Sequence, residues 1–294
     1  GIGIVAYFSK ADWHVPSYWA PHMERGDFTW RGPSYKPEEH KDLWEEFVQF
    51  THNQLLELCT RYGKIDVLWF DAGWVCEQSG QDIRLGEAVD KIRKIQPWII
   101  SADRTIGGPY ENYITPEQCI PSKPIPVPWE SCITMGTSFS FAYEDDYKST
   151  RELIHMLLNI VAKGGNLALN VGPQPDGRLP RTAIKRIKEM GKWLDKNGEG
   201  IYGTRVCSPY LQDGFAFTQK AKEHTVYAFK LCEEGEKVEE VFNIPYTEQA
   251  VKEVTVLGTT TSVVFKQTEE GIQVRVPSEL IEEGAIAIGF KLEV

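Results

Sequence analysis

The chain has no apolar run of about twenty residues, the length that a helix needs to cross a bilayer, so we expect no membrane span. It has no excess of positive charge either, since 32 Lys and Arg stand against 42 Asp and Glu, which gives a net charge of −10. No basic surface is therefore available to hold a nucleic acid or an anionic membrane, and neither is expected as a partner.

The cysteines and histidines lack the spacings of a metal site. The six cysteines include no C-x-x-C pair and no spacing typical of zinc, and they form no recognisable disulfide framework. The six histidines show no metal-ligand spacing either. We therefore expect no metal, no cofactor, and cysteines that are free and mostly buried.

Short apolar runs alternate with long amphipathic segments up to about Arg205. This alternation is typical of βα units with a parallel sheet or barrel. The helices are predicted from apolar residues at helical spacing, with Pro or acidic residues near their starts and Gly at their ends. The predicted strands are 2–9, 65–71, 98–103, 125–130 and 165–171, and the predicted helices are 37–63, 83–96, 147–162 and 180–196.

After Arg205 the pattern changes to short strands separated by turn signals, which is typical of an antiparallel sandwich. We therefore expect two domains, a catalytic (β/α) barrel portion over residues 1–205 and an antiparallel β-sandwich over 206–294. The predicted strands of the second domain are 214–219, 225–231, 238–244, 251–257, 261–266, 271–276 and 285–292.

The first domain is short for a closed barrel. An eight-stranded α/β barrel takes about 250 residues, and about 205 are present. The chain opens on Gly1–Ser9, which is strand-like and has neither the basic start nor the cleavage site of a signal peptide. We therefore expect a (β/α)8-type (TIM) barrel that is incomplete at its N-terminal side.

The run Ile65–Trp74 is the most informative stretch of the sequence. It is apolar and rich in β-formers, and its strand part ends in the carboxylate of Asp71, which a turn follows at once. Barrel enzymes place reacting groups at the C-terminal ends of buried strands, so Asp71 is a candidate nucleophile. The alternative is that Asp71 caps the next helix or bonds a turn amide.

A pair of carboxyl groups at the C-terminal ends of different strands is the minimal equipment for glycoside hydrolysis. Asp71 would be one member of such a pair, and two glutamates are candidates for the other. Glu130 ends an apolar run beside Trp129 and Ile133, where burial would raise its pKa enough for it to donate a proton near neutrality. Glu117 lies in a predicted loop, where a solvated charge is the simpler interpretation. We expect Glu130 to be the general acid and base, with Glu117 as the alternative.

Two further residues follow predicted strands. Arg104 comes directly after the strand 98–103, and a cation there would keep Asp71 ionised while the acid stays protonated. The alternative for Arg104 is a surface pair with Asp103, which would contribute little. His14 follows Trp13 at a strand end and is a candidate for lining the pocket.

Several distinct motifs lie at or near the predicted strand ends and turns. They are Tyr7-Phe8-Ser9 with Asp12-Trp13, Leu68-Trp69-Phe70-Asp71, Asp103-Arg104, Trp129-Glu130-x-Cys132, Gly164-Gly165-Asn166-Leu167-Ala168-Leu169-Asn170-Val171-Gly172-Pro173 with Asp176-Gly177, and Gly200-Ile201-Tyr202-Gly203. Together they resemble the α-L-fucosidases of glycoside hydrolase family 29. The resemblance covers nearly the whole chain from Gly3 to about Arg205, and the C-terminal sandwich is also expected in that family.

The resemblance implies an exo-acting, retaining double displacement. Asp71 would attack the anomeric carbon, a fucosyl-enzyme ester would form, and the acid residue would then act as a base toward water. Tyr7, Trp69 and Arg104 would lie around the fucose and the nucleophile, and Phe139 would lie near the C6 methyl group. Members of the family place the acid/base at the position of either Glu130 or Glu117.

The resemblance also sets the expected surroundings of the protein. The substrate would be a fucosylated oligosaccharide or glycoconjugate, and the compartment would lie outside the cytoplasm (periplasmic, secreted or lysosomal); a homo-oligomer is left open. The family's N-terminal strands, with their sugar-binding histidines, have no counterpart, because the chain begins where about the fourth barrel strand belongs. Alternatives are a non-catalytic glycan-binding homologue, an inactive fragment, or a retaining glycosidase for another sugar.

Overall fold

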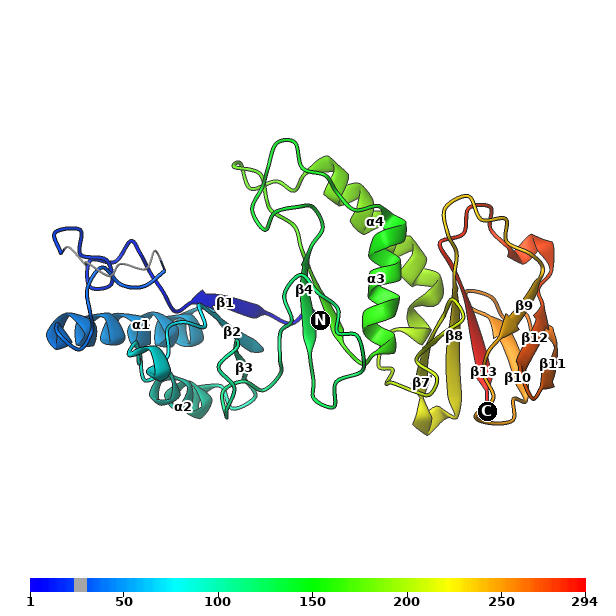
Figure 1. Ribbon diagram of the computed structural model, residues 1–294, viewed down its shortest axis with the longest axis horizontal. Helices are drawn as coiled ribbons and strands as arrows, with labels where there is room; N and C mark the ends of the chain where they lie inside the picture. Colours follow the sequence, from blue (N-terminus) through cyan, green and yellow to red (C-terminus); the bar gives the residue numbers. More distant parts are fainter. Residues whose placement is uncertain (24–30) are drawn as a thin grey trace. The chain divides into compact units, whose positions relative to one another are not determined.

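The computed structural model describes residues 1–23 and 31–294. The chain divides into two compact units, Gly1–Thr115 and Pro116–Val294. In the first unit, three parallel strands lie in the order β1-β2-β3, and α1 and α2 connect them (Figure 1). Their bounds are β1 (Val5–Ser9), α1 (Lys41–Arg61), β2 (Val67–Asp71), the short helix η1 (Glu77–Ser79), α2 (Leu85–Ile95) and β3 (Ile100–Asp103). The predicted βα alternation and parallel pairing are confirmed here.

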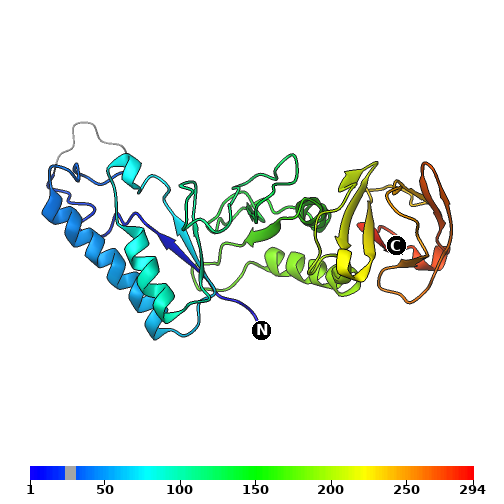
Figure 2. The ribbon, with the colours of Figure 1, turned by 90° about the horizontal axis from the view of Figure 1, so that it is seen from below.

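One face of this sheet carries the core of the first unit. Leu68 and Phe70 of β2 pack with Phe47 and Leu55 of α1 and with Ile92 of α2. Each of these side chains is buried, which contributes about 1.5–3 kcal/mol per residue relative to exposure. Both helices lie on the same side of the strands (Figure 2). Residues that alternate with Leu68 and Phe70 therefore point to the opposite face.

The register of the sheet brings the C-terminal ends of its strands together. Ser9 of β1 lies opposite Asp71 of β2, and Phe70 of β2 lies opposite Asp103 of β3. Residues that follow these ends, such as Lys10 and Arg104, therefore leave the sheet at the same edge.

The second unit begins with another parallel pair. Glu130 lies opposite Asn166, and Thr134 opposite Asn170. The following helix starts at a Ser149 capping box, in which the Ser149 hydroxyl accepts from the Glu152 amide and the Glu152 carboxylate accepts from the Ser149 amide. The elements are β4 (Glu130–Thr134), α3 (Thr150–Ala162), β5 (Asn166–Asn170), α4 (Arg181–Asn197) and η2 (Gly198–Gly200).

The predicted strand over 125–130 is wrong. The strand β4 starts at Glu130 and runs to Thr134, so Glu130 is its first residue and not its last. The reason lies in the three alternate prolines, Pro124, Pro126 and Pro128, which have no amide to donate to a sheet ladder. The apolar run therefore leads into the strand and does not form it.

The rest of the second unit is antiparallel, as predicted. A five-stranded sheet has the order β10-β13-β8-β7-β6, and a three-stranded sheet has the order β11-β12-β9. Phe217 and Phe290 of the first sheet pack with Phe242 and Val274 of the second, which makes a sandwich (Figure 2). The strands are β6 (Leu211–Gln212), β7 (Phe215–Lys220), β8 (Thr225–Leu231), β9 (Val241–Ile244), β10 (Glu253–Val256), β11 (Val264–Thr268), β12 (Gly271–Arg275) and β13 (Ala287–Glu293), with the short helices η3 (Ala221–Glu223) and η4 (Ser278–Leu280).

The predicted domain boundary at 205/206 falls inside the second unit. The outer face of the five-stranded sheet packs on α3 and α4, through Tyr227 and Phe229 against Leu158 and Met190. A single core thus joins residues on both sides of Arg205.

Three expectations about composition can be compared with the described residues. Their helices include none that is long and apolar enough to cross a membrane. Residues 1–23 and 31–294 bring together no group of three or more His, Cys, Asp or Glu side chains suited to a metal ion. The six cysteines, all of them in the described residues, form no disulfide, but only Cys59 and Cys232 are buried, so the expectation of mostly buried thiols is wrong.

Candidate active site

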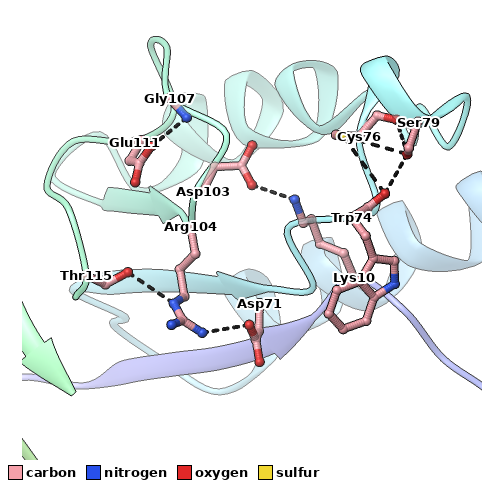
Figure 3. A network of polar contacts seen from close by, with 10 residues as sticks. All are labelled: Lys10, Asp71, Trp74, Cys76, Ser79, Asp103, Arg104, Gly107, Glu111 and Thr115. Carbon is pink, nitrogen blue, oxygen red and sulfur yellow. Dashed lines mark hydrogen bonds and ion pairs between the residues drawn. The ribbon is translucent and has the colours of Figure 1, made fainter. Parts of the chain in front are cut away.

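Asp71 is the last residue of β2, and each of its carboxylate oxygens receives a hydrogen bond. The Tyr7 hydroxyl donates to Oδ2 at 2.7 Å, and Nη1 of Arg104 donates to Oδ1 at 2.7 Å (Figure 3 shows the Arg104 bond). Tyr7 belongs to β1, and Arg104 follows β3, so all three strands contribute to the cluster. The Asp71 side chain is held in one orientation and keeps part of its surface open to solvent.

Arg104 is itself fixed from two other directions. Its Nε donates to Thr115 Oγ1 at 3.0 Å, and its guanidinium carbon lies 4.3 Å from the centroid of the Trp69 ring. Stacking on an indole and a hydrogen bond along the guanidinium edge leave little freedom to this buried side chain. Arg104 therefore presents a fixed positive charge to Asp71.

The aromatic rings of Trp69 and Tyr7 lie side by side on the strands that carry the Asp71 cluster. They are register partners on β2 and β1, and their ring centroids lie 5.4 Å apart. The Trp69 ring is buried, whereas 60% of Tyr7 is exposed. The apolar faces of sugars stack on exposed aromatic rings, so the Tyr7 ring suits a carbohydrate placed next to Asp71, and the buried Trp69 ring supports Tyr7 and Arg104.

The surroundings of Asp71 keep its carboxyl group ionised. Burial raises the pKa of Asp71, but the hydrogen bonds from Tyr7 and the Ala72 amide and the charge of Arg104 outweigh burial, so the pKa lies below its ordinary value. A nucleophilic carboxylate has to be deprotonated when substrate binds. The cluster meets that requirement from mildly acidic pH upward.

The turns after β2 and β3 have unusual backbones and pack against each other. Ala72 and Thr105 have φ values of 67°, in the left-handed region that non-glycine residues rarely adopt. Gly73 touches the second turn so closely that a Cβ there would overlap the Thr105 side chain and lie 3.0 Å from the Arg104 carbonyl oxygen. Strained backbone of this kind clusters at functional sites, and here it follows both Asp71 and Arg104 directly.

Glu130 and Glu117 both belong to the second unit, on different parts of the same sheet. Glu130 is half-buried at the start of β4, next to the fully buried Trp129. Glu117 is exposed, and it forms a parallel bridge with Cys132 in the middle of β4. The Cys132 amide donates to the Pro116 carbonyl, and its carbonyl accepts from the Gln118 amide, each at 2.9 Å.

The short segment around Glu117 reaches the C-terminal edge of β4. The Gln118 side chain donates to Thr134 Oγ1 at 3.2 Å and accepts from the Thr134 amide at 3.3 Å, and Thr134 is the last residue of the strand. Glu130 lies four residues earlier, about 13 Å along a strand that rises about 3.3 Å per residue. Glu117 therefore lies nearer than Glu130 to the edge at which β4 ends.

The remaining predicted residues are His14 in the first unit and Phe139 in the second. His14 is exposed in the turn after β1 and lines a hollow of about 1040 Å³ with residues of α1, among them Glu46 and Phe50. Its amide donates to Asp12 Oδ1 at 2.9 Å. Phe139 is 41% exposed in the loop after β4. The roles proposed for both residues toward a sugar stay predictions.

Sequence reasoning missed Lys10 and misjudged Asp103. Lys10 is 1% exposed, and its Nζ lies 2.6 Å from Asp103 Oδ1 (Figure 3). The alternative of an Asp103–Arg104 surface pair is wrong, because both residues are buried and bind different partners. The rule that singled out Asp71, a charged residue at the end of a strand-like apolar run, would also have found Lys10. Nothing in the sequence marks Thr115.

Comparisons with known proteins show which family this chain resembles. Residues 1–199 match the family model described as alpha-L-fucosidase. A plasma alpha-L-fucosidase of Rattus norvegicus is 28% identical over 247 residues, which are 77% of this chain and 51% of that protein. The chain thus spans about half the length of curated relatives that it matches.

Two solved structures show the same fold over most of the chain. Alpha-L-fucosidase isoenzyme 1 from Paenibacillus thiaminolyticus superposes with a TM-score of 0.80 at 27% identity, over 98% of this chain and 70% of that one. An alpha-fucosidase of Thermotoga maritima, in complex with a mechanism-based inhibitor, has a TM-score of 0.72 at 26% identity, over 86% of this chain and 60% of that one.

Proposed function

Because the chain belongs to the alpha-L-fucosidase family, we propose that it is an exo-acting, retaining α-L-fucosidase that removes terminal α-L-fucose from oligosaccharides or glycoconjugates. One observation carries the proposal. The Asp71 carboxylate, at the C-terminal end of a parallel strand, is held ionised by Tyr7 and Arg104 beside the Trp69 ring.

Asp71 is the proposed nucleophile of a double displacement. An oxygen of Asp71 attacks the anomeric carbon as the glycosidic bond breaks, and a fucosyl ester forms. A general acid protonates the leaving oxygen, and the same group then removes a proton from the water that hydrolyses the ester. The Thermotoga maritima relative was solved with a mechanism-based inhibitor, which supports a reaction of this class.

Arg104 and Tyr7 have two roles in this scheme. Their hydrogen bonds fix the orientation of the Asp71 carboxylate, so the side chain loses little conformational entropy when it attacks. They also hold the pKa of Asp71 below its ordinary value, which keeps the nucleophile ionised while a separate carboxyl group carries the proton.

For the acid/base we favour Glu117 over Glu130, which reverses the order of preference that the sequence suggested. The sequence argument placed Glu130 at the end of a strand, but Glu130 begins β4. Glu117 lies in a segment that runs parallel to β4 and extends to its last residue. Reacting groups of α/β barrels come from the C-terminal ends of strands, and Glu117 meets this condition better.

The wider architecture and setting are also part of the proposal. We place the parallel strands of residues 1–205 in a (β/α)8 barrel, followed by the sandwich of residues 206–294. The enzyme would work outside the cytoplasm, as the name of the plasma relative from Rattus norvegicus suggests.

Trapping of the covalent intermediate tests the nucleophile directly. The protein is incubated with a 2-fluoro-fucosyl fluoride, whose fluorine slows hydrolysis of the ester, and the labelled peptide is located by mass spectrometry. We expect the label on Asp71, and Asp71→Asn should abolish turnover while fucose still binds, with partial rescue by azide. A fully active Asp71→Asn variant would refute the assignment. A wild-type protein that binds fucose but turns over no aryl fucoside would favour the non-catalytic alternative.

A further inference from the structure

Lys10 and Asp103 form a buried ion pair that bridges β1 and β3, the outer strands of the three-stranded sheet of the first unit. Lys10 follows β1, and Asp103 ends β3, so the pair spans the C-terminal end of β2, the strand between them. Lys10 is 1% exposed and Asp103 7%, and the distance between Nζ and Oδ1 is 2.6 Å. Replacing a buried ion pair with apolar side chains of similar size is often neutral or stabilising, so stability alone is a weak explanation for this pair.

The pair is connected to Asp71 by two short paths. The Lys10 amide donates to the Asp71 carbonyl oxygen at 3.2 Å, so the Lys10 backbone fixes the end of β2. Asp103 is the neighbour in sequence of Arg104, whose amide donates to the Phe70 carbonyl at 3.4 Å. Lys10 is therefore one hydrogen bond away from the candidate nucleophile Asp71. Asp103 is one peptide bond away from Arg104, the cation that pairs with Asp71.

Asp103 and Arg104 point to different sides of the sheet. Asp103 pairs in register with Phe70, whose side chain lies in the core under the helices, whereas Arg104 reaches Asp71 on the other face. Figure 3 shows the two side chains leaving the chain in different directions. Holding Asp103 by its carboxylate therefore fixes the direction in which the Arg104 side chain starts.

The backbone at this point needs such a restraint. Thr105, directly after Arg104, and Ala72, directly after Asp71, both have left-handed φ values, and the two turns touch at Gly73. A non-glycine residue keeps this conformation only where its surroundings over-determine it. The Lys10–Asp103 pair supplies a fixed point next to each of the two turns.

We propose that Lys10 and Asp103 are positioning residues, which aim Arg104 at Asp71 and do not themselves contact substrate. This inference rests on the proposed function for its catalytic consequence only. The geometry of the cluster is independent of which sugar is hydrolysed.

The test uses the full chain with the double substitution Lys10→Met and Asp103→Leu. These side chains match the originals in size, so the buried site stays filled and no unpaired charge is left, whereas either single substitution would leave one. The matched control is Gln96→Leu, which removes a buried polar anchor from the opposite end of the same sheet.

We expect the double variant to retain its fold, with kcat on an aryl fucoside reduced about tenfold to hundredfold and KM nearly unchanged, as for a misplaced catalytic group. The Gln96→Leu control should lose melting temperature but keep kcat within about twofold, because its loss lies far from the reacting atoms. Wild-type kcat in the double variant would overturn the proposal. An equal loss of kcat in the Gln96→Leu control would show that the Lys10–Asp103 pair has a structural role only, and this result would also overturn the proposal.

A second measurement needs no activity. The pKa of the Asp71 carboxyl is followed by carbon-13 NMR, with Asp71→Asn used to assign its signal. Within residues 1–23 and 31–294, the titratable side chains that the structure shows bonded to the Asp71 carboxylate are Tyr7 from β1 and Arg104 from the end of β3. If Lys10 and Asp103 aim Arg104, the pKa of Asp71 rises in the double variant, and an unchanged titration refutes the inference. If wild type hydrolyses no fucoside, the proposed function fails while this test still decides the positioning role.

Discussion

The two ends of the three-stranded sheet are held together by different chemistry. At the C-terminal end, Arg104 pairs with Asp71 and Lys10 pairs with Asp103, and the charges of Lys10, Asp103 and Arg104 are buried. At the N-terminal end, the neutral side chain of Gln96 has the corresponding position. The same three strands and the same two helices are involved at both ends, so the difference does not come from the fold.

Gln96 shows what a purely structural anchor looks like. Its Oε1 accepts from the Ile65 amide at 2.9 Å, and its Nε2 donates to the carbonyls of Cys59 at 2.7 Å and Gly63 at 3.0 Å. It thereby joins the end of α1, the loop after it and the start of β2 without burying a charge. Since a neutral amide suffices to fix one end, the buried charges at the other end are best explained by chemistry.

The second unit allows the same comparison, because its two candidate acids lie toward different ends of one strand. Glu130 begins β4, and Glu117 lies beside the part of β4 that leads to its last residue. If reactivity belongs to C-terminal strand ends, only Glu117 should act as the acid. The two residues thus form a matched pair for substitution.

The largest predicted effect is that of Glu117→Gln. Its rate on fucosides with poor leaving groups should fall about 10²- to 10⁴-fold, because these need a proton on the leaving oxygen, while aryl fucosides with acidic phenols should react almost normally. Steady-state kcat/KM across a series of phenols, plotted against leaving-group pKa, measures this directly.

Glu130→Gln is the control for that experiment. It keeps the size of the side chain at the start of β4, and we expect its dependence on the leaving group to match that of wild type. The opposite result, a steep dependence in Glu130→Gln alone, would return the acid/base role to Glu130 and contradict the comparison of strand ends.

An intermediate effect is expected for Gln96→Leu, on stability and not on activity. The substitution leaves the buried Ile65 amide and Cys59 carbonyl without their partner, whereas the Gly63 carbonyl lies at an exposed residue and can bond water. Each unsatisfied buried group costs about 1–3 kcal/mol, so a total loss of roughly 2–6 kcal/mol is expected. Calorimetry would show a lower melting temperature. A proportionate loss of kcat would mean that the two ends of the sheet are not functionally separate.

The sequence predicted the elements well where local patterns decide them. All four long helices and the strands at 5–9, 67–71, 100–103 and 166–170 lie within the predicted ranges or overlap them closely. The carboxylate at Asp71 followed from a single rule about strand ends, and the structure brings Tyr7, Trp69 and Arg104 to it.

What the sequence could not supply depends on pairing between distant residues. Asp103 and Arg104 are adjacent, and no local pattern says that one binds Lys10 and the other Asp71 on opposite faces. The position of Glu130 was missed because an apolar run containing alternate prolines resembles a strand in hydrophobicity but lacks the amides of one.

The smallest predicted effect is that of Tyr7→Phe, and its size depends on pH. The hydroxyl donates to Asp71 Oδ2 at 2.7 Å at a partly exposed position, so its loss should lower kcat/KM by roughly fivefold, or about 1 kcal/mol. Removing this donor raises the pKa of Asp71 toward its ordinary value, since the Tyr7 hydrogen bond is the largest of the influences that lower it.

The acid limb of kcat/KM follows the ionisation of Asp71 in the free enzyme, so it should move to higher pH in Tyr7→Phe. The folded-state pKa of Asp71 is depressed, so its ionised form stabilises the fold above the unfolded pKa of about 3.9, and this contribution disappears as pH falls through the folded pKa. Tyr7→Phe should therefore be less stable than wild type near neutrality and equally stable in strong acid. Thermal unfolding of both proteins from about pH 2 to pH 7 checks this prediction, and a stability difference that grows toward low pH would show that Tyr7 does not act through the Asp71 carboxylate.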